Sequence, residues 1–327
     1  MKKRVSLVAP FYNESGNVLE FFRRVAVVAD SLPQYAFEVI AVNDGSRDAT
    51  WNELLEARSR HPWVHLVDLS RNFGKEAALT AGLDRARGDA VVPIDSDLQH
   101  PPELLGEMLA QWEQGAEVVL GRRTDRDTDG RLQKISATSF YRFHNMISNV
   151  KVPMDVGDFR LMDRRVVQAL RLLPENHRFM KGLFAWVGFR TVTIPYTIAK
   201  RHAGKSNFNG WKLWNLALEG ITSFSTAPLK IWTYVGLGVS ALALLYAAVI
   251  VLRTVVQGID VPGYASLMVS GMFLGGVQLI GIGVLGEYVG RIYHEVKRRP
   301  VYLVREEHEF ERAVLHPVRQ ERELERA

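Results

Sequence analysis

The chain contains no cysteine among its 327 residues. This absence excludes a disulfide framework and any zinc site with thiolate ligands. A long apolar segment is also missing from the N-terminus, because the basic residues Lys2, Lys3 and Arg4 lead directly into the short strand-like run 5–9. A secretory signal peptide has a longer apolar region after its charged start. We therefore expect no signal peptide and a cytoplasmic location for the N-terminal part.

Charge is missing from two further stretches, residues 231–252 and 261–286. Each could cross a hydrocarbon layer of about 30 Å as a helix, and the alternative, a buried core helix, rarely runs so long without a charge. Basic residues flank the pair on its outer sides at Lys200, Arg201, Lys205, Lys212, Lys230, Arg291, Lys297, Arg298 and Arg299. The positive-inside rule then places both ends of a two-helix hairpin in the cytoplasm. Anionic lipid is a sufficient partner for the basic pI of about 9.4, so nucleic acid is not required.

The first half lacks a Gly-x-Gly-x-x-Gly motif after its first strand, which weakens the case for a dinucleotide. Strand-like and helical patterns nevertheless alternate along it. We predict strands at 4–9, 37–42, 64–69, 90–94 and 117–121, and helices at 16–30, 50–60 and 74–86. Thr50 and Glu53 are expected to form a capping box. In a parallel sheet the polar loops after these strands would meet at one edge, where α/β proteins bind nucleotides.

Two carboxylates follow the strand predicted at 90–94. Asp95 and Asp97 alternate along an extended backbone and can share one hard cation, with the amide oxygen of Gln99 as a third ligand on the same side. Mg²⁺ and Mn²⁺ both suit oxygen ligands, and the residues do not choose between them. The alternative is an ordinary turn, in which aspartates are common.

Pro10, Tyr12, Glu14 and Asp44 follow the first two predicted strands. A ring that can stack and carboxylates that accept hydrogen bonds from a base or a ribose suit a nucleoside. Capping of the loops explains each of these residues equally well when it is taken singly.

Four segments resemble, in order and spacing, the motifs of the family 2 glycosyltransferases: 8–14 (VAPFYNE), 42–48 (VNDGSRD), 71–75 (RNFGK) and 95–103 (DSDLQHPPE). Within that family the chain resembles the polyprenyl-phosphate glycosyltransferases, which are relatives of dolichyl-phosphate mannose synthase. Residues 201–206 (RHAGKS), 211–215 (WKLWN) and 220–225 (GITSFS) are similar to the bactoprenol glucosyltransferases of O-antigen modification in lipopolysaccharide. The resemblance implies an α/β GT-A fold with a mostly parallel sheet, a UDP-sugar donor, a divalent cation, undecaprenyl phosphate as acceptor and a place in the bacterial inner membrane.

The resemblance also implies roles for individual residues. Asp95, Asp97 and Gln99 would hold the metal, while Arg123 and Arg160, the latter in the segment 157–160 (GDFR), would hold the acceptor phosphate. Donor contacts are expected from Pro10, Tyr12, Glu14, Asp44, Asp95, Ser96, Lys181, Arg201 and Lys205. Because the second pKa of a phosphate is about 6, the acceptor needs little help from a general base. We expect one displacement that inverts the sugar, with the protein positioning two anions and screening their repulsion.

The expected organisation is a catalytic domain at 1–208, an interfacial amphipathic helix at 209–228, the membrane hairpin at 229–287, and a juxtamembrane helix with a cytoplasmic tail at 288–327. The tail after Val304 is expected to be poorly packed, and the charged segment 122–131 to be mobile. Asn207 stands where related sequences often carry lysine, which leaves the contact of that lysine in doubt. The chain has no Gln-x-x-Arg-Trp, a motif of processive polysaccharide synthases, so a polymerising enzyme is disfavoured.

Three alternatives stay open. The donor sugar could be N-acetylglucosamine, galactose or mannose, since glucose rests on resemblance alone. The chain could be a catalytically inactive scaffold or binding module, although the intact Asp95, Asp97 and Gln99 argue against this. A homo-oligomer is compatible with the sequence. A membrane-anchored P-loop NTPase is the rival from a different class, because residues 199–206 (AKRHAGKS) differ by one residue from a phosphate loop. Residues 207–210 favour a turn where the helix of a P-loop should begin.

Overall fold

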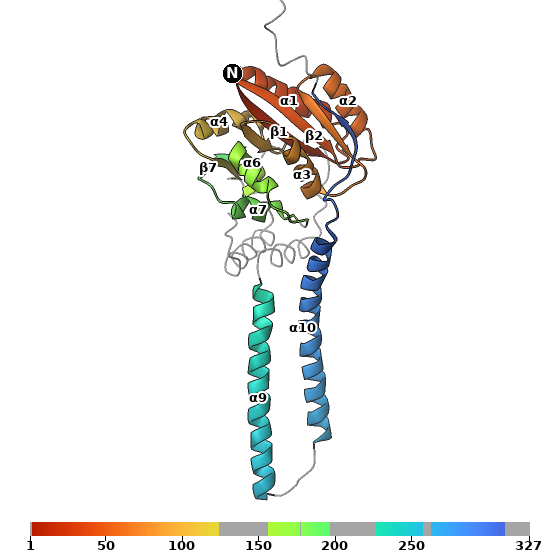
Figure 1. Ribbon diagram of the computed structural model, residues 1–327, viewed down its shortest axis with the longest axis vertical. Helices are drawn as coiled ribbons and strands as arrows, with labels where there is room; N and C mark the ends of the chain where they lie inside the picture. Colours follow the sequence, from red (N-terminus) through yellow and green to blue (C-terminus); the bar gives the residue numbers. More distant parts are fainter. Residues whose placement is uncertain (1, 124–155, 177, 197–225, 258–262, 311–327) are drawn as a thin grey trace, which may run out of the picture.

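The computed structural model describes residues 2–123, 156–176, 178–196, 226–257 and 263–310. Figure 1 shows an α/β head from which two long helices extend side by side in one direction.

An eight-stranded sheet forms the centre of the head, in the order β7-β5-β6-β4-β1-β2-β3-β8. The strands are β1 (Lys3–Phe11), β2 (Tyr35–Asn43), β3 (Val64–Leu69), β4 (Ala90–Pro93), β5 (Val118–Arg123), β6 (Val156–Asp163), β7 (Thr191–Tyr196) and β8 (Val304–His308). β1 to β4 run parallel, and β5 is parallel to β7, whereas β6 is antiparallel to β4 and β5 and β8 is antiparallel to β3. The prediction of an α/β fold with a mostly parallel sheet is confirmed.

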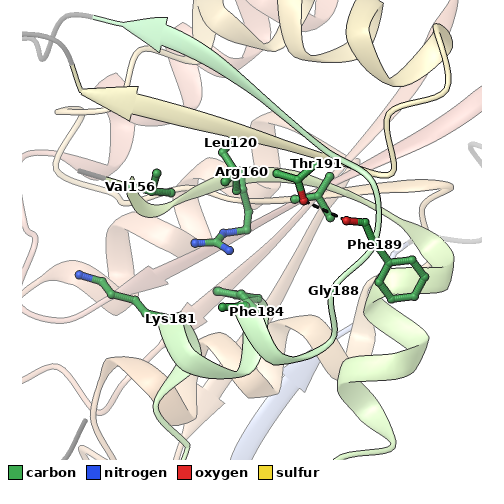
Figure 2. A pocket seen from close by; sticks show the side chains of 10 residues that line it. Leu120, Val156, Arg160, Lys181, Phe184, Gly188, Phe189 and Thr191 are labelled. Carbon is green, nitrogen blue, oxygen red and sulfur yellow. Dashed lines mark hydrogen bonds between the residues drawn. The ribbon is translucent and has the colours of Figure 1, made fainter. Parts of the chain in front are cut away.

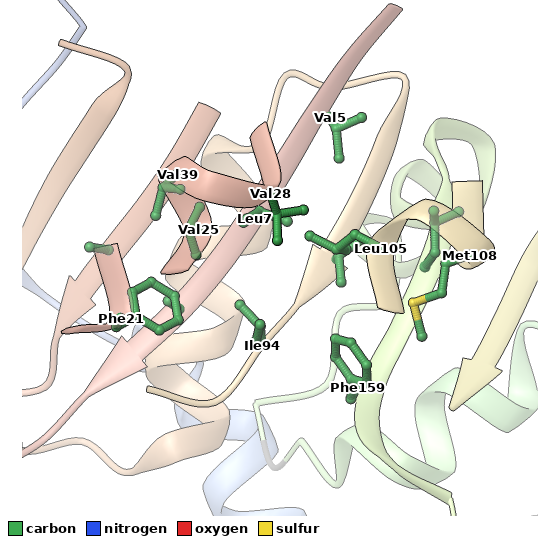
Figure 3. Close-up of a cluster of buried hydrophobic side chains, with 14 of the residues drawn as sticks. Val5, Leu7, Phe21, Val25, Val28, Val39, Ile94, Leu105, Met108 and Phe159 are labelled. Atoms are coloured by element: carbon green, nitrogen blue, oxygen red, sulfur yellow. The ribbon is translucent and has the colours of Figure 1, made fainter. Parts of the chain in front are cut away.

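Helices cover both faces of the sheet, because successive strand residues point to opposite sides. Leu7 of β1 belongs to one apolar core and the adjacent Val8 to the other. The first core includes residues of α1 (Val18–Ser31), α2 (Thr50–Arg60) and α4 (Leu105–Glu113), which follows a 3-10 turn (Pro102–Leu104). The second core includes residues of α3 (Lys75–Arg85), α6 (Arg164–Arg171) and α7 (Met180–Trp186). Figure 3 shows the first core, with Leu105 of α4 near Phe159 of β6.

The strands and helices predicted for the first half are present, with ends that differ by a few residues. The prediction of a capping box at Thr50 and Glu53 is wrong. Glu53 does not cap its own helix but accepts hydrogen bonds from Ser15 Oγ and the Gly16 N–H, while Asp48 accepts from the Thr50 N–H. The side chain of Glu53 therefore ties the loop after β1 to α2.

The two charge-free runs lie almost entirely within α9 (Ala227–Gln257) and α10 (Tyr264–Lys297). Two stretches, Leu229–Arg253 and Ser266–Lys297, are long and apolar enough to cross a membrane, and the described residues do not bury them. This exposure argues against the core-helix alternative and fits a lipid environment. Residues 288–297, expected to form a separate juxtamembrane helix, continue α10 without a break. Residues 209–225 of the expected interfacial helix lie outside the described residues.

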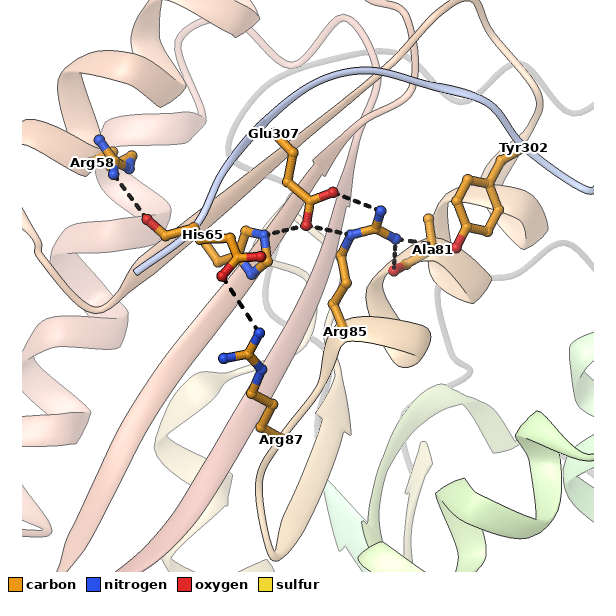
Figure 4. A network of polar contacts seen from close by, with 8 residues as sticks. Arg58, His65, Ala81, Arg85, Arg87, Tyr302 and Glu307 are labelled. Carbon is orange, nitrogen blue, oxygen red and sulfur yellow. Dashed lines mark hydrogen bonds and ion pairs between the residues drawn. The ribbon is translucent and has the colours of Figure 1, made fainter. Parts of the chain in front are cut away.

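The chain after α10 returns to the head, where β8 pairs with the edge strand β3. Glu307 lies 2.8 Å from His65 Nε2 and accepts two hydrogen bonds, each also of 2.8 Å, from the guanidinium of Arg85 (Figure 4). The expectation that the chain is poorly packed after Val304 is therefore wrong for the residues up to His308. An edge strand leaves backbone N–H and C=O groups unpaired, and β8 satisfies those of β3. Residues 311–327 lie outside the described part.

Candidate active site

The carboxyl ends of β1, β2 and β4 and the start of α3 surround a pocket of about 300 Å³, which we call the acidic pocket. Its lining residues are Pro10, Phe11, Tyr12, Glu14, Asp44, Asn72, Gly74, Lys75, Asp95, Ser96 and Asp97. The structure thus brings together all the donor-side residues that the sequence placed in the loops after these three strands. The reason is topological, since parallel strands deliver their carboxyl ends to one edge of the sheet.

Asp44 shapes one wall of the acidic pocket. Its carboxylate accepts hydrogen bonds from the N–H groups of Phe73 at 2.7 Å and Gly74 at 2.9 Å. Gly45, with φ of +64°, lies so close to the Arg71 backbone that a Cβ atom would collide with it. Burial raises the pKa of Asp44, although the two N–H groups act in the opposite direction. Asp44 therefore fixes the loop that leads into α3.

A tight turn after β4 gathers three potential metal ligands. Leu98 adopts a φ of 60°, and the N–H of Gln99 donates to Asp97 Oδ1 at 3.1 Å. One ligand atom each from Asp95, Asp97 and His100 lies within 4.8 Å of the others. The sequence predicted the two aspartates of this group but missed His100.

His100 has the properties of a metal ligand. Burial lowers its pKa, so the ring is neutral near pH 7, and its ring stacks on Phe159 with 5.1 Å between centroids. Its Nδ1 is buried, lies 3.6 Å from Asp95 Oδ2 and has no hydrogen-bond partner in the part of the chain that the structure describes. Neutral imidazole nitrogens and carboxylates both bind divalent cations, so the residues present fit such an ion. The spacing Asp-x-Asp-x-x-His was the available signal, but only the turn at Leu98 brings the ring back to the carboxylates.

Lys75 joins Asp95 to a carboxylate on another strand. Its Nζ lies 2.6 Å from Asp95 Oδ1 and 2.8 Å from Asp158 Oδ2 on β6. Burial lowers the pKa of Lys75, but the charges of Asp95 and Asp158 outweigh this effect and raise the pKa above its usual value. Both residues lie within the sequence motifs 71–75 and 157–160, but the sequence predicts no role for either, because their contact joins segments that are far apart in the chain.

The pKa values of Asp158 and Glu76, two carboxyl groups close to Lys75, are shifted in opposite directions. Burial raises the pKa of Asp158, but the positive charges of Lys75 and Lys181 outweigh it and hold the value at about 2. Burial and the charge of Asp158 raise the pKa of Glu76 to about 8. Near pH 7, therefore, Asp158 is charged and Glu76 is largely protonated. Glu76 Oε2 also accepts a hydrogen bond from the N–H of Met180, the first residue of α7, at 3.3 Å.

A second pocket, of about 180 Å³, lies between the strands β5 to β7 and α7. It is lined by Val118, Leu120, Val156, Arg160, Lys181, Phe184, Ala185, Gly188, Phe189 and Thr191. Figure 2 shows Arg160 reaching into it from β6 and Lys181 from α7. We call it the basic pocket.

Arg160 is a buried cation with unused hydrogen-bonding capacity. Only 6% of the residue is exposed, its Nη2 donates to the carbonyl of Gly157 at 2.8 Å, and its guanidinium lies 4.0 Å from the ring centroid of Phe184. Burial lowers the pKa of Arg160 to about 10, so the group stays charged at neutral pH. Its Nε finds no hydrogen-bond partner among the described residues. Such a guanidinium beside Lys181 is suited to bind an anion with several oxygens, such as a phosphate.

Several predicted positions lie outside the described residues. The backbone of Arg123 pairs with Tyr196 at the end of β5, but the position of its side chain is not described. Arg201, Lys205, Asn207 and the P-loop-like segment 199–206 fall within 197–225, and most of the charged segment 122–131 falls within 124–155.

Comparisons with known proteins agree with the motifs. Residues 6–171 match the family described as glycosyl transferase family 2, and residues 227–292 match the GtrB C-terminal hairpin. A prophage-derived bactoprenol glucosyl transferase of Shigella flexneri is 53% identical over 303 residues, which cover 93% of this chain and 98% of that protein. A prophage bactoprenol glucosyl transferase homolog of Escherichia coli K12 is 51% identical over 302 residues, covering 92% and 98%.

Solved structures are more distant. The mannosyltransferase PcManGT from Pyrobaculum calidifontis, in complex with GDP-Man and Mn²⁺, covers 88% of each chain at 17% identity, with a TM-score of 0.46. That similarity is too low to bear on substrate or metal. The family match and the two relatives are decisive on their own, and the chain belongs to glycosyl transferase family 2, with a GT-A-like head and a C-terminal hairpin of the GtrB type.

Proposed function

We propose that this protein transfers glucose from UDP-glucose to undecaprenyl phosphate at the cytoplasmic face of a bacterial inner membrane. The observation that carries the proposal is the ion pair of Lys75 with Asp95 and Asp158. Asp95 lines the acidic pocket, and Asp158 precedes Arg160 of the basic pocket by two residues on β6. One ammonium group therefore links a site suited to a nucleotide sugar with a site suited to a phosphate. The relatives named as bactoprenol glucosyl transferases support the same assignment of donor sugar and acceptor.

In the acidic pocket, Tyr12 is 44% exposed and its ring can stack on the base, while Glu14 can accept hydrogen bonds from the nucleoside. GT-A enzymes of this family typically bind a divalent cation. Asp95 and Asp97, with His100 or Gln99, would hold Mg²⁺ or Mn²⁺, which when bound neutralises the diphosphate leaving group. Pro10, Asp44 and Ser96 complete the wall on which the donor would lie.

In the basic pocket, Arg160 and Lys181 would hold the acceptor phosphate and screen its repulsion from the donor. Lys181 thus moves from the donor contacts expected from the sequence to the acceptor side. Arg123, Arg201 and Lys205 remain proposed phosphate contacts. A phosphate oxygen forms the new bond to the anomeric carbon as the bond to the UDP oxygen breaks, so UDP leaves and the α-linked donor gives a β-linked product. The acceptor is already a dianion, so no proton has to be removed from it.

The long helices α9 and α10 would form the membrane hairpin, with both chain ends in the cytoplasm according to the positive-inside rule. The proposed organisation keeps the catalytic domain at 1–208, an interfacial segment at 209–228, the hairpin at 229–287 and the juxtamembrane and tail region at 288–327. The head would then meet its lipid acceptor at the membrane surface. A homo-oligomer remains compatible with this arrangement.

The test is a donor panel with purified protein and undecaprenyl phosphate. Radiolabelled UDP-glucose, UDP-N-acetylglucosamine, UDP-galactose and GDP-mannose are each incubated with and without EDTA, and label is counted in the chloroform-soluble lipid. We expect label from UDP-glucose only, lost with EDTA and restored by Mg²⁺ or Mn²⁺. Lipid label from another donor would reassign the sugar. Phosphate release from ATP without any glycolipid would favour the P-loop alternative.

A further inference from the structure

Glutamates from two different elements hold the start of α7 and the loop before it. Glu76 at the start of α3 accepts a hydrogen bond from the Met180 N–H at 3.3 Å. Glu295, in the last turn of α10, accepts the N–H of Asn176 with its two carboxylate oxygens, at 3.0 and 3.1 Å. The long apolar helix α10 is therefore attached directly to the loop that leads into α7.

Hydrogen bonds within that loop stiffen it, so a displacement of the loop is passed on to α7. The guanidinium of Arg178 donates to the carbonyl of Glu175 at 3.2 Å and to that of Leu173 at 2.9 Å. Behind the loop, Met180 and Leu183 are buried in the second core, at 0% and 2% exposure. A displacement of the loop would therefore move α7 as a unit.

Two side chains of α7 form part of the basic pocket. Lys181 and Phe184 line it opposite Arg160, and the ring of Phe184 lies 4.0 Å from the guanidinium of Arg160. The placement of α7 on β6 thus sets the distance between the two cations of the pocket. Through the loop before α7, α10 contributes to that placement.

The carboxylate of Glu295 stands at an unfavourable place on its helix. The C-terminal turn of a helix carries partial negative charge and favours basic side chains, of which Lys297 is one. An acidic side chain there weakens the helix end unless it gains contacts elsewhere, and hydrogen bonds from a backbone N–H to a carboxylate are of the stronger kind. The contact between the head and α10 offsets this cost.

We propose that Glu295 is a positioning residue, which couples the membrane-facing helix α10 to α7 and so holds Lys181 at the distance from Arg160 that a lipid-linked phosphate requires. The inference rests on the proposed function, since it takes the basic pocket as the acceptor site. It assigns to the hairpin a task beyond anchoring, namely the fixing of the acceptor pocket relative to the membrane.

The first test compares Glu295→Ala with Glu295→Gln in the full-length protein in nanodiscs. Alanine removes both acceptors, whereas glutamine keeps one carbonyl oxygen. We expect the KM for undecaprenyl phosphate to rise about tenfold in the alanine variant and to return most of the way with glutamine. The affinity for UDP-glucose should not change, which also shows that the head is folded. Glu287→Ala, which removes an exposed carboxylate paired with Arg291 on the same helix, is the matched control and should behave as wild type.

The second test is independent of activity. Amide hydrogen exchange in a peptide covering 173–184 should become faster in Glu295→Ala, while exchange in α6 stays as in wild type. An unchanged lipid KM, or a loss of donor affinity together with lipid affinity, overturns the inference; the latter result would make Glu295 a residue that stabilises the fold. If the wild-type protein transfers no sugar to lipid phosphate, the proposed function fails. If the wild type is active and Glu295→Ala leaves the KM for undecaprenyl phosphate unchanged, only the role of Glu295 is contradicted.

Discussion

The Nζ atom of Lys75 lies 2.6 Å from Oδ1 of Asp95, just after β4, and 2.8 Å from Oδ2 of Asp158 on the neighbouring strand β6. This contact leaves Oδ2 of Asp95 on the side of His100, 3.6 Å from its Nδ1. Lys75 therefore does two things at once: it orients one oxygen of a proposed metal ligand, and it keeps two carboxylates of neighbouring strands from repelling each other.

Replacing Lys75 with methionine is expected to lower kcat/KM about a hundredfold, the usual scale for the loss of one preorganised charge in an active site. Asp95 and Asp158 would then lose the ammonium group that they share, and Mn²⁺ binding should change as well. Steady-state kinetics and Mn²⁺ titration measure the two effects. Lys3→Met, which breaks a surface ion pair with Glu113, is the control. Wild-type kinetics in Lys75→Met would remove Lys75 from the mechanism.

The metal ligands predicted from the sequence and those found in the structure differ in one member, and binding can separate them. If His100 is a ligand, His100→Ala should weaken Mn²⁺ binding tenfold or more while Gln99→Ala has a smaller effect. Electron paramagnetic resonance of free Mn²⁺ during a titration gives both affinities without turnover. The reverse order of effects would restore Gln99 as the third ligand. His308→Ala, at a half-buried position on β8 away from the acidic pocket, is the matched control.

Arg160→Lys is expected to raise the KM for undecaprenyl phosphate about tenfold and to leave the affinity for UDP-glucose near that of wild type. Lysine keeps the charge but loses the planar fork that pairs with two phosphate oxygens. Varying the lipid and the donor separately in a radiometric assay distinguishes the two constants. Arg165→Ala, which removes an exposed arginine of α6, should change neither. A rise confined to the donor KM would move Arg160 to the acidic pocket.

The carboxyl group of Glu76 should make the stability of the head depend on pH. Its pKa is raised from 4.5 to about 8 in the folded state. Between these values the folded protein holds a proton that the unfolded chain has released, so stability falls as the pH rises through this window, and the loss is complete above about pH 8.

Glutamine at position 76 has no proton to lose, so Glu76→Gln is expected to be more stable than wild type at pH 9. The expected difference in the free energy of unfolding is more than about 1 kcal/mol, because a pKa shift of several units corresponds to more than that. Near pH 5 the two proteins should unfold alike. Tryptophan fluorescence during thermal unfolding measures both. Glu107→Gln, at an exposed position on α4, should show no such trend. Parallel stability profiles for Glu76→Gln and wild type would contradict the assignment.

Glu307→Ala should destabilise the attachment of β8 by about 1–3 kcal/mol, because the buried side chain of His65 and the guanidinium of Arg85 both lose their acceptor. Thermal unfolding or limited proteolysis of the C-terminal segment reports the change. Glu306→Ala, on the adjacent and more exposed residue, provides the comparison. Equal effects of the two substitutions would show that Glu307 has no special part.

The sequence by itself determined which residues gather at the edge of the sheet. Strand periodicity and the order of strands and helices are local signals, and a parallel topology then forces Pro10, Tyr12, Asp44 and Asp95 into one pocket. The two apolar helices could also be predicted from the sequence, because a long run without charge is recognised without knowledge of its tertiary contacts.

Tertiary structure alone decided the contacts that couple these parts. The bridge from Lys75 to Asp158, the return of His100 through a left-handed turn at Leu98, and the pairing of β8 with β3 all depend on which distant segments become neighbours. No local pattern encodes such a choice, because any one lysine, histidine or charged strand satisfies its own backbone preferences equally well elsewhere. Burying a charged or backbone polar group costs free energy unless the group is paired, and these partners meet only when the whole head has folded.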